Sequence, residues 1–279
     1  MRTLYVTDLD GTLMKNDMTI SAESVRILNQ LIERGILITY ATARSFQSAY
    51  DITKDIRFKI PVITRNGNTL ADHMAAKEME TAFFPIDVIY DLKGLLPVID
   101  RCGFTSVYID GEMYKLYQGG EKSKEFQGYI DYYQSIEDKR MRMVDNTEKQ
   151  FEGKVSYITL ISTREELLPY YEAVKASGRW ETVFQKDTYR DEYWLEICPK
   201  DSTKAKAVLK LKDRLECDRL VVFGDSINDL PMFEVADEGI GVSNARPEIL
   251  QAADQIIGSN EDDAVAKFIQ SVEIDGLGD

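Results

Sequence analysis

Cysteine and histidine are scarce in this chain of 279 residues, which has three cysteines and a single histidine, His73. Cys102, Cys198 and Cys217 are far apart, odd in number and without C-x-x-C spacing. The pattern therefore predicts neither a disulfide framework nor a zinc site, and it favours buried free thiols. We interpret His73 as a solvated loop residue, although histidine can also act as a base or a metal ligand.

Long hydrophobic runs and positive charge are also lacking. No stretch approaches the ~18–20 apolar residues that a membrane-spanning helix needs, and the N-terminal segment reaches Asp8 too early for a secretory signal, so we expect a cytoplasmic protein. The 34 basic residues face 48 acidic ones, which gives a formal net charge of −14. Such a surface repels nucleic acid and anionic membranes, and no obligate protein partner is indicated. A phosphorylated ligand would need a locally positive site.

The first third of the chain alternates strand and helix patterns. A β-prone run at Thr3–Thr7 is followed by a helix that Ser21 can cap and Gly35 can end. The apolar run 36–41 is typical of a strand buried on both faces of a parallel sheet. Further helix and strand patterns up to about residue 64 complete a βαβαβ order, which predicts an α/β protein with a Rossmann-like, doubly wound parallel sheet.

The last third resumes this order with an amphipathic stretch at 204–215 and a buried strand at 220–223. The middle differs, because aromatic residues are dense there and the strand patterns are antiparallel, with a hairpin turn at Asp110-Gly111. We therefore predict that a separate α+β domain is inserted into the core. The predicted boundaries are 1–83 for the first part of the core, 84–190 for the insert and 191–279 for the second part of the core.

Two acidic residues follow the first predicted strand directly, in Asp8-Leu9-Asp10-Gly11-Thr12. In an open parallel sheet, ligands bind at the carboxyl ends of the strands. A spacing of two lets one carboxylate attack a phosphorus atom while the other reaches the leaving-group oxygen as a general acid. By itself, however, a D-x-D pair at the end of a strand could equally be a solvated turn.

A second acidic segment, Gly224-Asp225-Ser226-Ile227-Asn228-Asp229, follows the buried strand at 220–223. If both strands are central in one sheet, Asp8, Asp10, Asp225 and Asp229 converge, and such a cluster requires a hard cation. Oxygen ligands with room for water and phosphate suit Mg²⁺ better than zinc or calcium. A calcium-binding or purely structural cluster is the alternative.

Two further residues can supply positive charge and hydrogen-bond donors. Thr42 ends the apolar run and precedes Ala43 and Arg44, so its hydroxyl and the nearby N–H groups could hold a phosphate oxygen. Lys204 opens the amphipathic stretch. Each is unremarkable alone, because a lone Thr often caps a helix and a lone Lys is usually solvated. Arg44 could contact a substrate or form a structural ion pair.

In combination, these motifs resemble the haloacid dehalogenase-like superfamily, and within it the Cof-type phosphatases with a large inserted α+β cap. The resemblance spans nearly the whole chain, and Asn66-Gly67 and Asn244-Ala245 also fit this subfamily. The four motifs occur in the expected order, as Asp8-Leu9-Asp10-Gly11-Thr12, Thr42, Lys204 and Gly224-Asp225-Ser226-Ile227-Asn228-Asp229. Four ordered motifs are far more specific than any one of them.

Departures from the family pattern are few. Ala43 and Ala205 stand where the family usually has glycine, and Val242-Ser243 replaces the usual Met-Gly before Asn244. None of these changes removes a catalytic group. They bear on how a substrate fits rather than on the class of reaction.

The resemblance implies a catalytic role for four residues. Asp8 would be the nucleophile that takes the phosphoryl group, and Asp10 would protonate the leaving alcohol and then activate the hydrolytic water. Thr42 would bind the phosphoryl oxygens. Lys204 would neutralise charge on Asp8 and on the phosphoryl group.

The resemblance also implies the ligands of Mg²⁺ and of the substrate. The Asp8 carboxylate, the Asp10 backbone carbonyl and Asp225 would hold the ion, with Asp229 as a further or water-mediated ligand. The residues expected to contact the substrate are Thr12, Ala43, Arg44 and Asn228.

These assignments imply a Mg²⁺-dependent phosphomonoester hydrolase that uses an aspartyl-phosphate intermediate and acts on small phosphorylated metabolites, such as sugar phosphates or phosphorylated cofactors. The cap would close over the site and exclude water. A phosphomutase or a dedicated sugar-phosphate phosphatase on the same fold is an alternative. A non-catalytic protein that binds phosphorylated metabolites is a further alternative, which the retained acidic residues disfavour.

Overall fold

The computed structural model describes residues 1–275, so the last four residues of the predicted third segment lie outside the described part. The chain divides into two compact units. Met1–Thr81 and the residues from Thr203 onward form one unit, here called the core, and Ala82–Ser202 form the other, here called the cap. Each unit has its own apolar interior.

The core contains a five-stranded parallel sheet in the order β14-β13-β12-β1-β2. Its inner strands are almost entirely buried, as expected for strands covered on both faces. The strands are β1 (Thr3–Thr7), β2 (Leu37–Tyr40), β12 (Arg219–Gly224), β13 (Glu238–Val242) and β14 (Gln255–Ile257).

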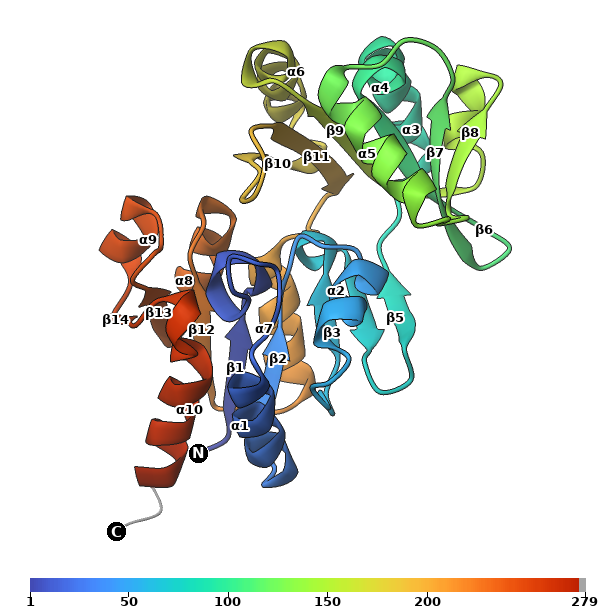
Figure 1. The fold of residues 1–279 in the computed structure, drawn as a ribbon. Coiled ribbons are helices and arrows are strands. Elements are labelled where there is room, and N and C mark those ends of the chain that lie inside the picture. The colour runs from blue at the N-terminus through green and yellow to red at the C-terminus, as the bar shows by residue number, and fades with distance from the viewer. Residues whose placement is uncertain (276–279) are drawn as a thin grey trace. The chain divides into compact units, whose positions relative to one another are not determined.

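Helices cover both faces of this sheet, which confirms the predicted doubly wound architecture. On one face α1 packs against α10, and on the other α7 packs against α8, which contacts α9 (Figure 1). Ser21 caps α1 as predicted, because its hydroxyl accepts a hydrogen bond from the Ser24 N–H. The core helices are α1 (Ala22–Glu33), α2 (Phe46–Thr53), α7 (Lys204–Arg214), α8 (Leu230–Phe233), α9 (Pro247–Ala252) and α10 (Ala264–Asp275).

The direction of strand succession reverses between β1 and β12. From β1 the chain moves outward to β2, whereas from β12 it moves to β13 and β14 on the opposite side. Thr7 is in register with Phe223, and the Asp8 N–H extends this ladder by donating to the Phe223 carbonyl at 2.9 Å. The segments that follow β1 and β12 therefore leave the sheet side by side, at the switch point where α/β folds bind ligands.

A small antiparallel sheet lies beside β2. The sequence predicted only its first strand, which ends at residue 64, and placed that strand in the parallel sheet. The small sheet consists of β3 (Val62–Thr64), β4 (Thr69–Asp72) and β5 (Lys77–Thr81). A parallel bridge between Ala41 and Ile63 joins it to the end of β2. The turn that connects β3 to β4, Arg65–Gly67, is thereby placed at the same end of the core as Asp8.

The cap is an α+β unit built on a six-stranded sheet in the order β10-β11-β9-β6-β7-β8, antiparallel except between β7 and β8. Helices α4 and α6 pack on it through an aliphatic cluster, and α5 packs through a separate aromatic cluster. The strands are β6 (Gly103–Ile109), β7 (Glu112–Gln118), β8 (Met141–Val144), β9 (Lys154–Ser162), β10 (Trp180–Lys186) and β11 (Tyr193–Pro199). The helices are α3 (Ile86–Leu92), α4 (Leu96–Cys102), α5 (Lys124–Ser135) and α6 (Arg164–Ser177).

The predicted second boundary of the insert, at 190, is too early. Strand β11 pairs with β9 and β10 in the cap sheet, so the cap extends to Ser202. The first boundary differs by only two residues, because the cap begins at Ala82 rather than at 84. The second boundary was predicted too early because residues 185–192, just before β11, are mostly polar, and such a composition is typical of a linker.

The interpretation of His73 as a solvated loop residue is also wrong, because His73 is only 3% exposed. Its ring packs against Tyr40, Tyr50 and Phe58, with centroid distances of 6.3, 5.0 and 5.2 Å. Its Nε2 lies 2.9 Å from the Thr53 hydroxyl, whose single proton goes to the Ala49 carbonyl, so Nε2 carries a proton. Burial lowers the pKa of His73 from 6.5 to about 4.

We expect His73 to make the core less stable in mild acid. Because the pKa of His73 is lower in the folded than in the unfolded state, its contribution is complete above pH 6.5 and is lost as the pH falls towards 4. The loss should approach about 3 kcal/mol. Urea unfolding at a series of pH values should show a flatter pH dependence between 6.5 and 4 for His73→Gln than for the unchanged protein. Parallel curves would contradict this assignment.

Candidate active site

The turn after β1 brings two acidic segments together. Asp8 follows β1 directly, and the next residues form a wide turn, Leu9–Leu13, in which Gly11 has a φ of +75°. A Cβ on Gly11 would lie 2.5 Å from Oδ2 of Asp225. Glycine is therefore required here for two reasons, its left-handed backbone and the close approach of the carboxylate that follows β12.

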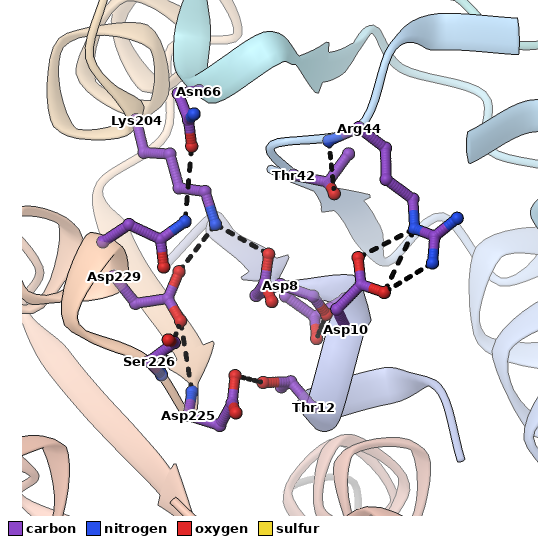
Figure 2. Close-up of polar contacts among 12 residues, drawn as sticks. Asp8, Asp10, Thr12, Thr42, Arg44, Asn66, Lys204, Asp225, Ser226 and Asp229 are labelled. Carbon is purple, nitrogen blue, oxygen red and sulfur yellow. Dashed lines mark hydrogen bonds and ion pairs between the residues drawn. The ribbon is translucent and has the colours of Figure 1, made fainter. Parts of the chain in front are cut away.

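A buried lysine lies between two of the carboxylates. Lys204 Nζ donates to Asp8 Oδ1 at 2.6 Å and to Asp229 Oδ1 at 2.7 Å (Figure 2). The three side chains are 1%, 7% and 0% exposed. Burial disfavours the charged ammonium group, but Asp229 and Asp8 outweigh it and raise the pKa of Lys204 above its usual value. The lysine is therefore charged at any physiological pH.

The side chains of Asp8, Asp225 and Asp229 form a compact carboxylate cluster, with one oxygen of each within 4.8 Å of the others. Burial and the neighbouring Asp229 raise the pKa of Asp225 to about 7, and burial raises the pKa of Asp8 although Lys204 opposes the shift. Three carboxylates around one ammonium group leave a formal charge of −2. A divalent cation with a preference for oxygen ligands fits this cluster in both charge and ligand type.

Asp10 does not join this cluster, although the sequence predicted that all four carboxylates would converge. Its side chain turns towards Arg44 instead, whose Nε and Nη2 lie 2.8 and 2.6 Å from the two carboxylate oxygens (Figure 2). Both side chains are about one-fifth exposed. The fork of the guanidinium group fixes the orientation of the carboxylate better than a single hydrogen bond would. Of the two possibilities for Arg44, the ion pair is present.

Thr42 and Ala43 lie on the loop that joins β2 to α2. Thr42 is fully buried, and its N–H donates to the Ile63 carbonyl at 3.0 Å. Its hydroxyl accepts a hydrogen bond from the Arg44 N–H at 3.2 Å and points towards Asp8 and Asp10 (Figure 2). Ala43 is partly exposed on the same loop. This loop therefore carries Thr42 and Arg44 to the edge of the sheet at which Asp8 lies.

Thr12 and Asn228, both predicted to contact the substrate, have protein partners. The Thr12 hydroxyl donates to Asp225 Oδ1 at 3.2 Å (Figure 2). Asn228 Nδ2 donates to Asn66 Oδ1 at 3.3 Å. Thr12 is buried, and its hydroxyl group holds one oxygen of the Asp225 carboxylate in place. A direct contact of either residue with the substrate stays a prediction.

Two asparagines to which the sequence analysis gave no role hold the site together. Asn66 accepts from Asn228, as described above. Asn244 Nδ2 donates to the Gly11 carbonyl at 2.8 Å, and its Oδ1 accepts from the Asn260 N–H at 2.9 Å. Both positions were visible as the motifs Asn66-Gly67 and Asn244-Ala245, but only the folded chain shows that they support the turns beside the carboxylates.

Comparison with known proteins agrees with this geometry. A family model described as haloacid dehalogenase-like hydrolase matches residues 5–269. The 5-amino-6-(5-phospho-D-ribitylamino)uracil phosphatase YwtE of Bacillus subtilis is 26% identical over 283 residues, which cover 95% of this chain and 96% of that protein. The HMP-PP phosphatase of Serratia proteamaculans is 26% identical over 97% of this chain and 95% of its own length. Pyridoxal phosphate phosphatase YbhA of Escherichia coli is 23% identical over 95% and 96%.

Solved structures share the fold. A haloacid dehalogenase-like hydrolase from Bacteroides thetaiotaomicron superposes with a TM-score of 0.75 at 22% identity, covering 98% of this chain and all of the other. One from B. subtilis gives a TM-score of 0.74 at 20% identity, covering 95% and 98%. The chain therefore belongs to the haloacid dehalogenase-like hydrolase family, and the curated relatives described above are named as phosphatases. The resemblance inferred from the four motifs is confirmed.

We expect the buried lysine to stabilise the core strongly in metal-free buffer. Lys204→Met leaves Asp8 and Asp229 buried without their cation, and breaking a buried ion pair in this way costs about 3 kcal/mol. Lys210 on the same helix is the matched control, because its ion pair with Glu80 is exposed and worth less than about 1 kcal/mol. Urea unfolding with EDTA, followed by circular dichroism, measures both losses.

Equal losses in the two variants would show that the Lys204 pair is not effectively buried. Trp180 and Trp194, the two tryptophans of the chain, both lie in the cap. Tryptophan fluorescence therefore reports the cap separately, and its transition should be the same in both variants.

Proposed function

We propose that this phosphatase is a Mg²⁺-dependent phosphomonoester hydrolase that forms an aspartyl-phosphate at Asp8. The observation that carries the proposal is the position of Asp8 at the switch point of the sheet, where Lys204 holds one carboxylate oxygen and the carboxylates of Asp225 and Asp229 are adjacent. A carboxylate so placed can serve as a nucleophile, and a fixed ammonium group can stabilise the charge that develops on a transferring phosphoryl group.

In the first half-reaction an Asp8 oxygen attacks the phosphorus atom of the substrate. The new bond joins the Asp8 oxygen to phosphorus, and the bond between phosphorus and the leaving-group oxygen breaks. Asp10 gives its proton to that oxygen, so an alcohol departs. Thr42 and Lys204 would donate hydrogen bonds to the phosphoryl oxygens and hold them while the charge is redistributed.

In the second half-reaction Asp10 takes a proton from water, and the water oxygen attacks the phosphorus atom. The bond between phosphorus and the Asp8 oxygen then breaks, which releases phosphate and restores the Asp8 carboxylate. One carboxyl group thus serves first as an acid and then as a base. Arg44 orients the Asp10 carboxylate for both steps.

The residues of the carboxylate cluster fit Mg²⁺ in the roles that the motifs suggest. Both oxygens of Asp229 already accept hydrogen bonds, Oδ1 from Lys204 and Oδ2 from the N–H groups of Asp225 and Ser226. The carboxylates of Asp8 and Asp225 and the Asp10 carbonyl would therefore hold the ion directly, and Asp229 would contribute through water. When bound, Mg²⁺ supplies positive charge that offsets the charge of the phosphoryl oxygens.

For the substrate we propose small phosphorylated metabolites, with phosphorylated cofactors and their precursors favoured over sugar phosphates. This preference rests on three relatives, which are named for 5-amino-6-(5-phospho-D-ribitylamino)uracil, HMP-PP and pyridoxal phosphate. The acidic charge of the chain also leads us to propose that it binds neither nucleic acid nor anionic membranes. A cytoplasmic location and the lack of an obligate protein partner stay predictions. In the part of the chain that the structure describes, no helix has the length and apolar character of a membrane span.

Asp8→Asn should abolish turnover, because an amide is far less nucleophilic than a carboxylate. Removing a nucleophile lowers kcat by about 10⁴-fold or more. The assay is release of phosphate from an aryl phosphate with Mg²⁺, compared with the same assay in EDTA, which should also be inactive. Asp51→Asn, a change at an exposed residue of α2, is the control and should retain full activity. Substantial turnover by Asp8→Asn would remove Asp8 from the role of nucleophile.

A panel of phosphorylated metabolites tests the substrate class. We expect kcat/KM to be at least about tenfold higher for pyridoxal phosphate or 5-amino-6-(5-phospho-D-ribitylamino)uracil than for hexose phosphates, because a difference of about 1.4 kcal/mol in transition-state binding gives that ratio. Conversion of a hexose phosphate into its isomer without free phosphate would favour the phosphomutase alternative. Tight binding without turnover under any divalent cation would favour the non-catalytic alternative.

A further inference from the structure

The turn between β3 and β4 has an unusual backbone. Arg65, Asn66 and Gly67 have φ values of +50°, +52° and +95°, so three consecutive residues are left-handed, two of which are not glycine. A left-handed conformation costs a residue with a side chain roughly 1 kcal/mol or more. Such a turn persists only where its surroundings fix it, and its surroundings here are the loops of the active site.

Backbone hydrogen bonds join this turn to the loop that carries Thr42. The Arg65 N–H donates to the Arg44 carbonyl and the Asn66 N–H donates to the Thr42 carbonyl, both at 2.9 Å. The Thr42 N–H in turn donates to the carbonyl of Ile63, the middle residue of β3, at 3.0 Å. Thr42 is therefore held on both sides of its peptide unit by β3 and the turn.

The same turn lies directly against the beginning of α7. A Cβ on Gly67 would be 2.2 Å from the Thr203 carbonyl oxygen and 3.0 Å from the Lys204 nitrogen. Both of these atoms belong to backbone, so they cannot move aside as a flexible side chain could. The first turn of α7, which carries Lys204, thus rests on the backbone of Gly67.

A third contact comes from the side chain of Asn66. Its Oδ1 accepts a hydrogen bond at 3.3 Å from Nδ2 of Asn228, which lies on the acidic segment that follows β12. The turn therefore touches three separate parts of the site, which come from distant positions in the sequence.

We propose that the Arg65-Asn66-Gly67 turn is a positioning element that sets the spacing between Thr42, Lys204 and Asn228. The inference rests on the proposed function, because it concerns how the phosphoryl-binding groups are kept in place. None of the three turn residues is assigned a contact with the reacting atoms. The turn acts through the residues that make those contacts.

The effect of losing this spacing should be large, because Lys204 is held within narrow limits. Its Nζ lies 2.6 Å from Asp8 Oδ1 and 2.7 Å from Asp229 Oδ1, so a small shift of the lysine would lengthen at least one of these hydrogen bonds. A displacement of about 1 Å in a catalytic constellation costs on the order of 100-fold in rate. Added bulk at Gly67 would push the start of α7 away from the turn.

Gly67→Ala tests the proposal, with Gly35→Ala as its matched control. Gly35 ends the first core helix with a φ of +90°, close to that of Gly67, but no atom lies within 4 Å of the position of its Cβ. Both variants therefore carry the same left-handed strain, and only Gly67→Ala meets the backbone of α7. Both are assayed with Mg²⁺ and an aryl phosphate, at a temperature where circular dichroism shows them folded.

We expect Gly67→Ala to lower kcat about 100-fold, while KM changes less than about threefold. Inhibition by orthovanadate, which needs the same donors around its central atom, should weaken in parallel. Gly35→Ala should match the unchanged protein within about threefold in kcat, in KM and in inhibition. Equal kinetics in the two variants would overturn the proposal.

Two substitutions of Asn66 distinguish the role of the turn's backbone from the role of the Asn66 side chain. Asn66→Gly keeps the left-handed conformation and loses the contact with Asn228, whereas Asn66→Ala loses the contact and also strains the backbone. We expect the alanine variant to be at least about tenfold slower than the glycine variant, because only it disturbs the turn. Identical rates in these two variants would contradict a backbone role.

Amide hydrogen exchange provides a readout that does not need turnover. The first turn of α7, from residue 204 onward, should exchange faster in Gly67→Ala than in Gly35→Ala, and equal exchange would count against the proposal. If the unchanged protein released no phosphate and Asp8→Asn made no difference, the proposed function would fail, and hydrogen exchange would still decide whether the turn positions α7.

Discussion

The whole site depends on one buried ammonium group held between two carboxylates. Lys204 comes from the start of α7, Asp8 from the end of β1 and Asp229 from the segment after β12, so these ion pairs fix three parts of the chain to one another. Without the lysine, the acidic side chains would repel one another in a space from which water is largely excluded. With it, the cluster retains a net negative charge that a divalent cation can neutralise. Lys204 and a divalent cation bound at this cluster would together supply the local positive charge that an acidic protein needs in order to hold a phosphorylated ligand.

Two kinds of support keep this arrangement in place. Glycines allow main chain and carboxylates to approach closely, at Gly11 beside Asp225 and at Gly67 beside Thr203. Amides then fasten the turns, as Asn244 does through the Gly11 carbonyl. The residues that would touch phosphate are thus surrounded by residues whose task is geometric. This division is typical of sites for phosphoryl transfer, where catalysis is largely a matter of position and charge.

The sequence predicted the core and the acidic motifs well, because both depend on local patterns. The apolar run before Thr42 and the run before Asp225 indicated buried strands, and the ordered motifs indicated the family. The prediction failed where distant contacts decide. Asp10 turns to Arg44 rather than to the other carboxylates, and nothing in a D-x-D spacing reveals this. His73 is buried by aromatic rings from α2 and from the loop at Phe58. Strand β11 belongs to the cap because it pairs with β9. Both outcomes depend on contacts between residues that are distant in the sequence.

The arrangement of the core has a consequence for how the molecule is assembled. The two central strands are far apart in the chain, since Thr3 of β1 pairs with Arg219 of β12. During synthesis β1 and β2 emerge long before β12 exists, so the sheet lacks its middle partner until the whole cap segment has been made. Pairing of such distant strands is slow, but a cap that has already folded brings Ala82 and Ser202 into one compact body and shortens the effective loop. The acidic cluster would accordingly be among the last features to form during synthesis. A chain truncated before α7 would contain Asp8, but it would lack Lys204 and the acidic segment after β12 and would therefore have no complete active site.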